Sequence, residues 1–155
     1  MKNSIHSLAP VKSFAHRDTR LFSQNQAQVI QTADGKIIAI DGGHYGESEA
    51  FLAYLRTLTG AAVPHIDAWL LTHPHNDHIE VFCEIMDKHS DAVTVGQVYY
   101  NFPSAQFCGN YGDTGASKTT ATFYSLLPRF ADRAVITSVG DAYDVGDAHI
   151  EILYS

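Results

Sequence analysis

Two neighbouring runs of this chain are rich in hydrophobic residues that favour β-strands. The runs span 27–32 and 36–40 and are joined through Ala33, Asp34 and Gly35. Asp-Gly is a favoured pair in tight hairpin turns, so the pattern predicts a β-hairpin. A glycine-rich turn follows at 41–46, where the backbone can adopt positive φ and approach another element closely.

The middle of the chain alternates between helical and strand patterns. Apolar positions recur at helical spacing over 47–58, and Gly60 ends that helix. Residues 68–72 are typical of the end of a buried strand, and helical spacing returns over 76–88. Another strand is predicted at 93–100. Alternating elements of this kind predict an α/β fold with a sheet covered by helices.

The last third of the chain is less regular. A long loop is predicted over 101–117, and its side chains could either line a substrate cleft or anchor the loop. The residues in question are Phe102, Phe107, Tyr111 and Asp113. A short helix is predicted at 119–127, followed by strands at 134–139 and 149–154.

Three histidines and one aspartate lie within six consecutive positions, at the turn between the strand ending at 72 and the helix 76–88. They are His73, His75, Asp77 and His78. Imidazole nitrogen and carboxylate oxygen are ligands that suit zinc, iron or manganese. The alternative is a helix start capped by Asn76 or Asp77 with solvated histidines. A cap needs one acceptor and no histidines, so the pattern favours a metal centre.

The stretch 72–78, preceded by 40–43, resembles the metallo-β-lactamase fold hydrolases, and within them the THPHxDH group. The resemblance spans about residues 25–100. It implies an αββα sandwich with a mixed sheet flanked by helices, of which this chain is the N-terminal half. Residues 1–155 would then form a single, incomplete domain. The family usually continues with a glycine pair where this chain has Ile79, Glu80 and Val81.

The resemblance also implies a role for each residue of the turn. His73 and His75 would bind a first metal ion, and Asp77 and His78 a second. Asp77 would also position the attacking water as the catalytic residue. Asp41 would be a structural neighbour of the turn and not a ligand. The cofactor implied is zinc, as two divalent ions, with iron or manganese as alternatives.

In the resembled family the remaining ligands come from the second half of the fold. After residue 100 the candidates in this chain are His149 and scattered aspartates, none of them in a matching context. We therefore expect residues 1–155 to be part of a longer hydrolase, with low metal occupancy, self-association and negligible turnover. The expected partners are a second copy of the chain or a missing C-terminal half.

Composition and charge exclude several classes of protein and of metal site. The 155 residues carry a formal net charge of −7, which argues against non-specific binding to nucleic acids or anionic membranes. The two cysteines are too few for a thiolate metal site, and Cys83 is predicted to lie in the core. No signal peptide or apolar run of about 20 residues is evident. A cytoplasmic location is the default expectation.

The leading hypothesis is a hydrolase that uses metal-activated hydroxide on an ester-like bond of a small molecule, with a phosphodiester favoured. Two alternatives remain open from the residues. One is a non-catalytic metal-binding or interaction module whose site is incomplete. The other is a di-iron redox protein of the same fold, which bound iron with visible absorbance would reveal.

Overall fold

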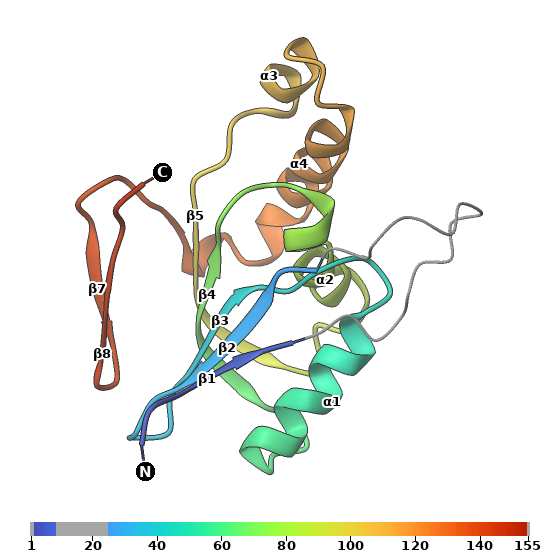
Figure 1. The fold of residues 1–155 in the computed structure, drawn as a ribbon. Coiled ribbons are helices and arrows are strands. Elements are labelled where there is room, and N and C mark those ends of the chain that lie inside the picture. Colours follow the sequence, from blue (N-terminus) through green and yellow to red (C-terminus); the bar gives the residue numbers. More distant parts are fainter. Residues whose placement is uncertain (1, 9–24, 155) are drawn as a thin grey trace.

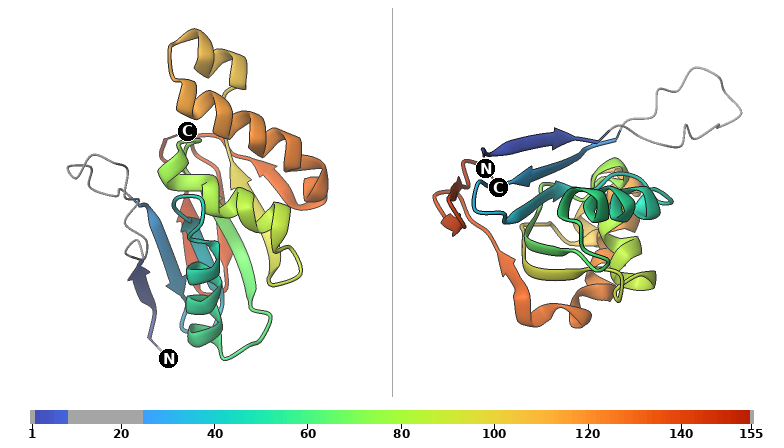
Figure 2. Two further views of the ribbon diagram at one scale, coloured as in Figure 1. Left: turned by 90° about the vertical axis from the view of Figure 1, so that its right-hand side faces the viewer. Right: turned by 90° about the horizontal axis from the view of Figure 1, so that it is seen from below.

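The protein forms three layers, with helices on one face of a sheet and a β-hairpin on the other (Figures 1 and 2). The structure is a computed structural model that describes residues 2–8 and 25–154. The sheet strands are β1 (Ser4–Ser7), β2 (Ala27–Gln31), β3 (Ile37–Asp41), β4 (His65–Leu71), β5 (Thr94–Tyr100) and β6 (Ala134–Ile136). The hairpin strands are β7 (Ala142–Val145) and β8 (Ala148–Glu151). The helices are α1 (Ser48–Thr59), α2 (Asn76–Lys88), α3 (Ala105–Asn110) and α4 (Thr114–Leu126), followed by short 3₁₀ turns at Leu127–Arg129 and Ala131–Arg133.

The main sheet has the strand order β1-β2-β3-β4-β5-β6. Strands β1 to β3 pair antiparallel, which confirms the predicted hairpin, and β3 to β6 pair parallel. The parallel pairs are connected by helices that pack on one face, as the alternating pattern predicts. The carboxyl ends of β3 and β4 therefore lie side by side, and the histidine turn follows β4 directly.

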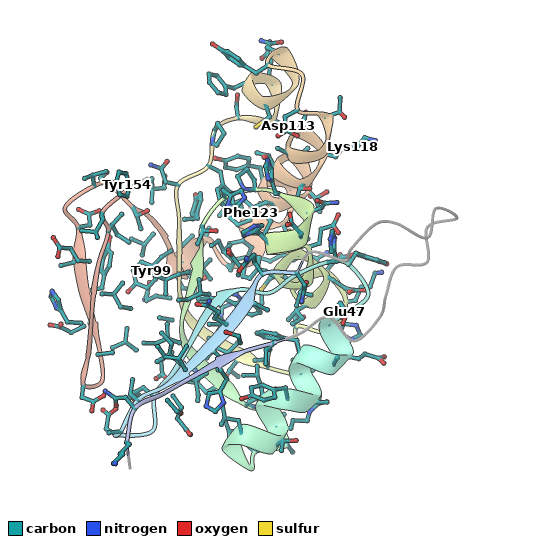
Figure 3. All side chains as sticks on the ribbon, in the orientation of Figure 1. Glu47, Tyr99, Asp113, Lys118, Phe123 and Tyr154 are labelled. Carbon is teal, nitrogen blue, oxygen red and sulfur yellow. The ribbon has the colours of Figure 1, made fainter. Side chains whose placement is uncertain are left out.

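The larger core lies between the sheet and the helices and is built around aromatic rings. Trp69 of β4 is fully buried, stacks on Phe51 of α1 at 5.4 Å and meets Phe82 of α2 edge-on at 5.0 Å. Phe123 of α4 lies 6.0 Å from Phe82, so the three helices share one core (Figure 3). Cys83 is buried on the same face of α2, which confirms its predicted place in the core.

The β7–β8 hairpin covers part of the opposite sheet face (Figure 2). Val145 of β7 packs with Ile38 and Ala68 in a second, smaller cluster, and the Tyr143 ring lies 4.4 Å from the ring of Tyr99 (Figure 3). The self-association expected from the sequence would be favoured by an exposed apolar sheet face. The hairpin supplies apolar side chains that partly bury it, because β7 and β8 alternate inward and outward residues.

The last third of the chain differs from its prediction, and there the strand predicted at 149–154 is β8, which ends at Glu151. The segment 101–117 is not a long loop, because it contains α3 and the first turn of α4. Both helices begin at capping side chains: Ser104 accepts a hydrogen bond from the Phe107 N–H, and Asp113 accepts one from the Ala116 N–H. The strand predicted at 134–139 ends at Ile136, and β7 was missed.

None of the helices in the described ranges has the length and apolar character needed to cross a membrane.

Candidate metal centre

The turn after β4 is fixed by backbone hydrogen bonds to the loop after β3. Gly43 donates its N–H to the carbonyl of His78 at 2.9 Å, and its own carbonyl accepts from Val81 at 3.0 Å. Gly43 has a φ of +101°, and a Cβ there would lie 1.8 Å from Asn25 Oδ1. Gly42 is constrained less severely, since a Cβ there would lie 3.0 Å from that of Val81. The glycine-rich turn thus lets β3 approach the start of α2.

This arrangement accounts for the missing glycine pair after His78. In the stretch that stands in place of that pair, Ile79 and Val81 are fully buried. The two glycines on the opposing loop leave room for these larger side chains, so the close approach is kept. Glu80 points the other way and accepts a hydrogen bond from the Tyr45 N–H at 3.0 Å.

Asp41 joins β3 to the turn through every polar atom of its side chain. One carboxylate oxygen accepts the backbone N–H of Thr72 at 2.8 Å, and the other accepts the Thr72 hydroxyl and His78 Nδ1, both at 2.7 Å. Its backbone carbonyl accepts the indole N–H of Trp69 at 2.7 Å. Asp41 is 3% exposed and has a φ of 55°, the single positive φ outside glycine among the described residues. Asp41 thus contacts the turn directly, and its predicted role beside a metal ion stays a prediction.

The same contacts determine which nitrogen of two histidines carries the proton. A carboxylate only accepts hydrogen bonds, so His78 must donate from Nδ1 to Asp41. Thr72 gives its one hydroxyl proton to Asp41, so it accepts from His73 Nδ1 at 3.1 Å. The lone pair of each neutral ring is therefore on Nε2, where it is available to a metal ion.

His75 is oriented by a different part of the chain. Its Nε2 lies 2.9 Å from a carboxylate oxygen of Asp113, the residue that caps α4. The other residues proposed for the cleft have different surroundings. Phe102 is buried against Phe123 in the core, whereas Phe107 and Tyr111 are exposed and in contact with each other at 4.6 Å.

The turn brings the predicted ligands into one neighbourhood. The ring centroids of His73 and His78 are 3.7 Å apart, those of His73 and His75 are 4.6 Å apart, and Asp77 Oδ2 lies 3.8 Å from His78 Nε2. Across residues 2–8 and 25–154, however, no three histidine, cysteine or carboxylate side chains converge on one point as a metal ion requires. The donors are of a chemical type that binds metal ions, and His73 and His78 each have a lone pair on Nε2 that a metal ion could accept.

Burial lowers the pKa of His73 below its ordinary value of 6.5, and the neighbouring rings of His78 and His75 lower it further. The folded chain therefore binds fewer protons than the unfolded chain just below pH 6.5. We predict that the free energy of unfolding of the metal-free protein falls as the pH drops below this value. Urea titrations at pH 7.5 and 5.5 should show a smaller difference for His73→Gln than for wild type. The exposed His149 supplies the control His149→Gln, and an unchanged pH dependence in His73→Gln would contradict the prediction.

The sequence and the fold were compared with those of known proteins. Residues 22–105 match the family profile of the metallo-beta-lactamase superfamily. Among solved structures 15 chains match, including a protein from Thermotoga maritima described as a "putative metallo-beta-lactamase". The two share 15% sequence identity with a TM-score of 0.54, over 93% of this chain and 63% of that one. This similarity shows the fold, and it spans less than two thirds of the neighbour's length. A search of curated proteins found no match.

Proposed function

Because this chain belongs to the metallo-beta-lactamase superfamily, we propose that it is a metal-dependent hydrolase centred on the turn after β4. The observation that carries the proposal is the gathering of three imidazoles and one carboxylate on this turn, with Nε2 of His73 and His78 left as acceptors. We assign His73 and His75 to one ion and Asp77 and His78 to a second. Zinc suits these donors best, and iron or manganese could replace it.

A divalent ion bound at this turn would supply a Lewis acid and lower the pKa of a nearby water. The residues of the chain have separate tasks. Asp77, in the first turn of α2, orients the water and accepts its proton. Asp41 and Thr72 hold the rings of His78 and His73. We extend the proposal to an ester-like bond in a small molecule, with a phosphodiester first, because paired ions can stabilise both the attacking and the leaving oxygen.

A second candidate function is a metal-binding module without catalysis. It is favoured by the absence, among the described residues, of three donors that converge on one ion. Catalytic zinc usually has three protein ligands and a water, and the turn offers two ligands to each ion in our assignment. The two candidates share metal binding and differ in turnover, so one set of measurements tests both.

Metal content is the first test. After dialysis against zinc-containing and then zinc-free buffer, we expect the wild-type protein to retain zinc at low occupancy and His75→Ala to retain still less. His149→Ala is the matched control, because His149 is an exposed histidine on β8. Elemental analysis gives the result. Equal zinc in wild type and His75→Ala would refute the assigned ligands.

Turnover is the second test. A nitrophenyl phosphodiester, a lactone and a chromogenic β-lactam should be compared with zinc in excess and with chelator added. Hydrolysis that chelator abolishes supports the hydrolase, and the preferred compound identifies the bond class. Hydrolysis that resists chelator would contradict metal dependence. Zinc retention without hydrolysis of any compound would favour the binding module.

A further inference from the structure

Asp113 lies 38 residues from His75 in sequence but is within hydrogen-bond distance of its ring. The Asp113 Oδ2 to His75 Nε2 distance is 2.9 Å, and Asp113 Oδ1 accepts the Ala116 N–H at 2.8 Å. Asp113 therefore uses one oxygen to begin α4 and the other to hold a histidine of the turn. The Asp113 N–H donates to the Cys108 carbonyl at 3.1 Å, which fixes the backbone between α3 and α4. Figure 3 shows Asp113 at the junction of these two helices.

The hydrogen bond has one chemically consistent direction. A carboxylate has no proton to donate, so Nε2 of His75 must carry the proton. The lone pair of the neutral ring is then on Nδ1. His75 thus differs from His73 and His78, whose lone pairs are on Nε2. Two ligands only two residues apart can present different nitrogens because separate segments hold them.

We propose that Asp113 is a positioning residue for the metal centre, which keeps His75 as the tautomer with a free Nδ1 and fixes the plane of its ring. This inference rests on the proposed function, since it assigns Nδ1 of His75 as the metal-binding nitrogen. Asp113 itself remains outside the ligand set because both of its oxygens are engaged. The α3–α4 segment thereby becomes part of the centre although it contains none of the ligands.

The His75–Asp113 pair is exposed to water, so a positioning role and a stabilising role predict different effects on metal affinity and on stability. The side chains of His75 and Asp113 are 47% and 45% exposed, and an ion pair in contact with water adds little to stability. Loss of the contact should therefore change metal affinity much more than stability. Partners that orient metal-binding histidines typically change metal affinity by about 10–100-fold when they are removed.

Two substitutions separate the two roles of Asp113, which are to cap α4 and to hydrogen-bond His75. Asp113→Ser keeps a side-chain oxygen for the cap of α4, since serine is as good a cap as aspartate, but it cannot reach His75. Asp113→Asn can cap α4 with its oxygen and then presents an N–H₂ group to His75 Nε2, which reverses the hydrogen bond. We expect zinc affinity to fall about 10-fold in Asp113→Ser and up to about 100-fold in Asp113→Asn. The exposed Asp91 supplies the charge-matched control Asp91→Asn.

Two readouts test the inference without measuring turnover. Zinc affinity is measured by competition with a chromophoric chelator, alongside the thermal midpoint of each variant. The tautomer of His75 is read from ¹⁵N–¹H correlation spectra of the metal-free protein. We expect a proton on Nε2 in wild type, a proton on Nδ1 in Asp113→Asn, and thermal midpoints close to that of wild type for Asp113→Ser.

The inference would be overturned by a wild-type spectrum with the His75 proton on Nδ1. It would also be overturned if both Asp113 variants bound zinc as tightly as Asp91→Asn. A wild-type protein that binds no zinc would instead refute the proposed function. In that case the spectra of the metal-free chain still decide whether Asp113 controls the tautomer of His75.

Discussion

Asp77→Asn is expected to lower kcat for ester hydrolysis about 10²–10⁴-fold with zinc in excess, the range that a positioned proton acceptor contributes. Asp77 lies in the first turn of α2, and its side chain is 17% exposed. Its Oδ2 atom lies 3.8 Å from His78 Nε2. Asparagine keeps the shape of the side chain but loses the negative charge that binds the ion and accepts the proton. The rate with a nitrophenyl phosphodiester measures the effect on catalysis, and chelator competition measures the loss of zinc affinity independently of turnover.

The matched control is Asp91→Asn, which removes one negative charge from an exposed position in the loop before β5. Its rate and zinc affinity should equal those of wild type. If Asp77→Asn behaves like this control in both measurements, Asp77 is neither a ligand nor the proton acceptor. If zinc affinity falls and the rate per bound zinc does not, Asp77 is a ligand alone.

The second large effect concerns stability. Asp41→Ala should lower the free energy of unfolding by about 3–6 kcal/mol, because the carboxylate accepts hydrogen bonds from Thr72 and His78 and each such bond to a charged group contributes about 1.5–3 kcal/mol. The substitution leaves the Thr72 N–H and the His78 Nδ1–H without their acceptor in a site where Asp41 is 3% exposed. Alanine must also adopt the φ of 55°, which short polar residues tolerate better.

Urea denaturation at pH 7.5 measures this loss as a shift of the midpoint at constant slope. Asp91→Ala is the control, and a substitution at such an exposed position should stay within about 0.5 kcal/mol of wild type. A loss below about 1 kcal/mol for Asp41→Ala would mean that water replaces the carboxylate at the turn. The role of Asp41 in holding His78 would then be wrong.

The central part of the fold could be predicted because its signals are local. Asp34 and Gly35 define the hairpin turn, and α2 spans Asn76–Lys88 as its apolar spacing predicts. Gly60 ends α1 with a φ of 71°, the left-handed conformation for which glycine is suited. The six positions around Pro74 also revealed the candidate site, since four donors occur there within one turn.

The rest depends on contacts that a sequence pattern does not contain. The α3–α4 segment has weak apolar periodicity, and its helices depend on the caps at Ser104 and Asp113. Both caps could have been found, because a serine or aspartate three residues before an N–H in a helical run is a start signal. The contact between Asp113 and His75 could not, because it joins positions 38 residues apart through the packing of α4 on α2.

Glu84 was likewise overlooked. It is buried on α2, although the apolar spacing of the helix leaves position 84 outside the hydrophobic stripe. Its carboxylate accepts the Gly46 N–H at 2.7 Å and so fastens the loop after β3 to α2. The sequence offered no signal for this contact, because position 84 falls on the predicted solvated polar face and its partner Gly46 lies 38 residues away.

The hydrogen bond from Trp69 to Asp41 gives the protein an internal optical probe. Trp69 is the one tryptophan in the sequence, so its fluorescence arises from a single position. The indole is fully buried, and its N–H donates to the carbonyl of the residue whose carboxylate holds His78. We therefore expect zinc bound at His78 to alter the surroundings of the indole through Asp41. Tryptophan emission of the unlabelled protein should then change during a zinc titration, and this change should be smaller in Asp41→Asn.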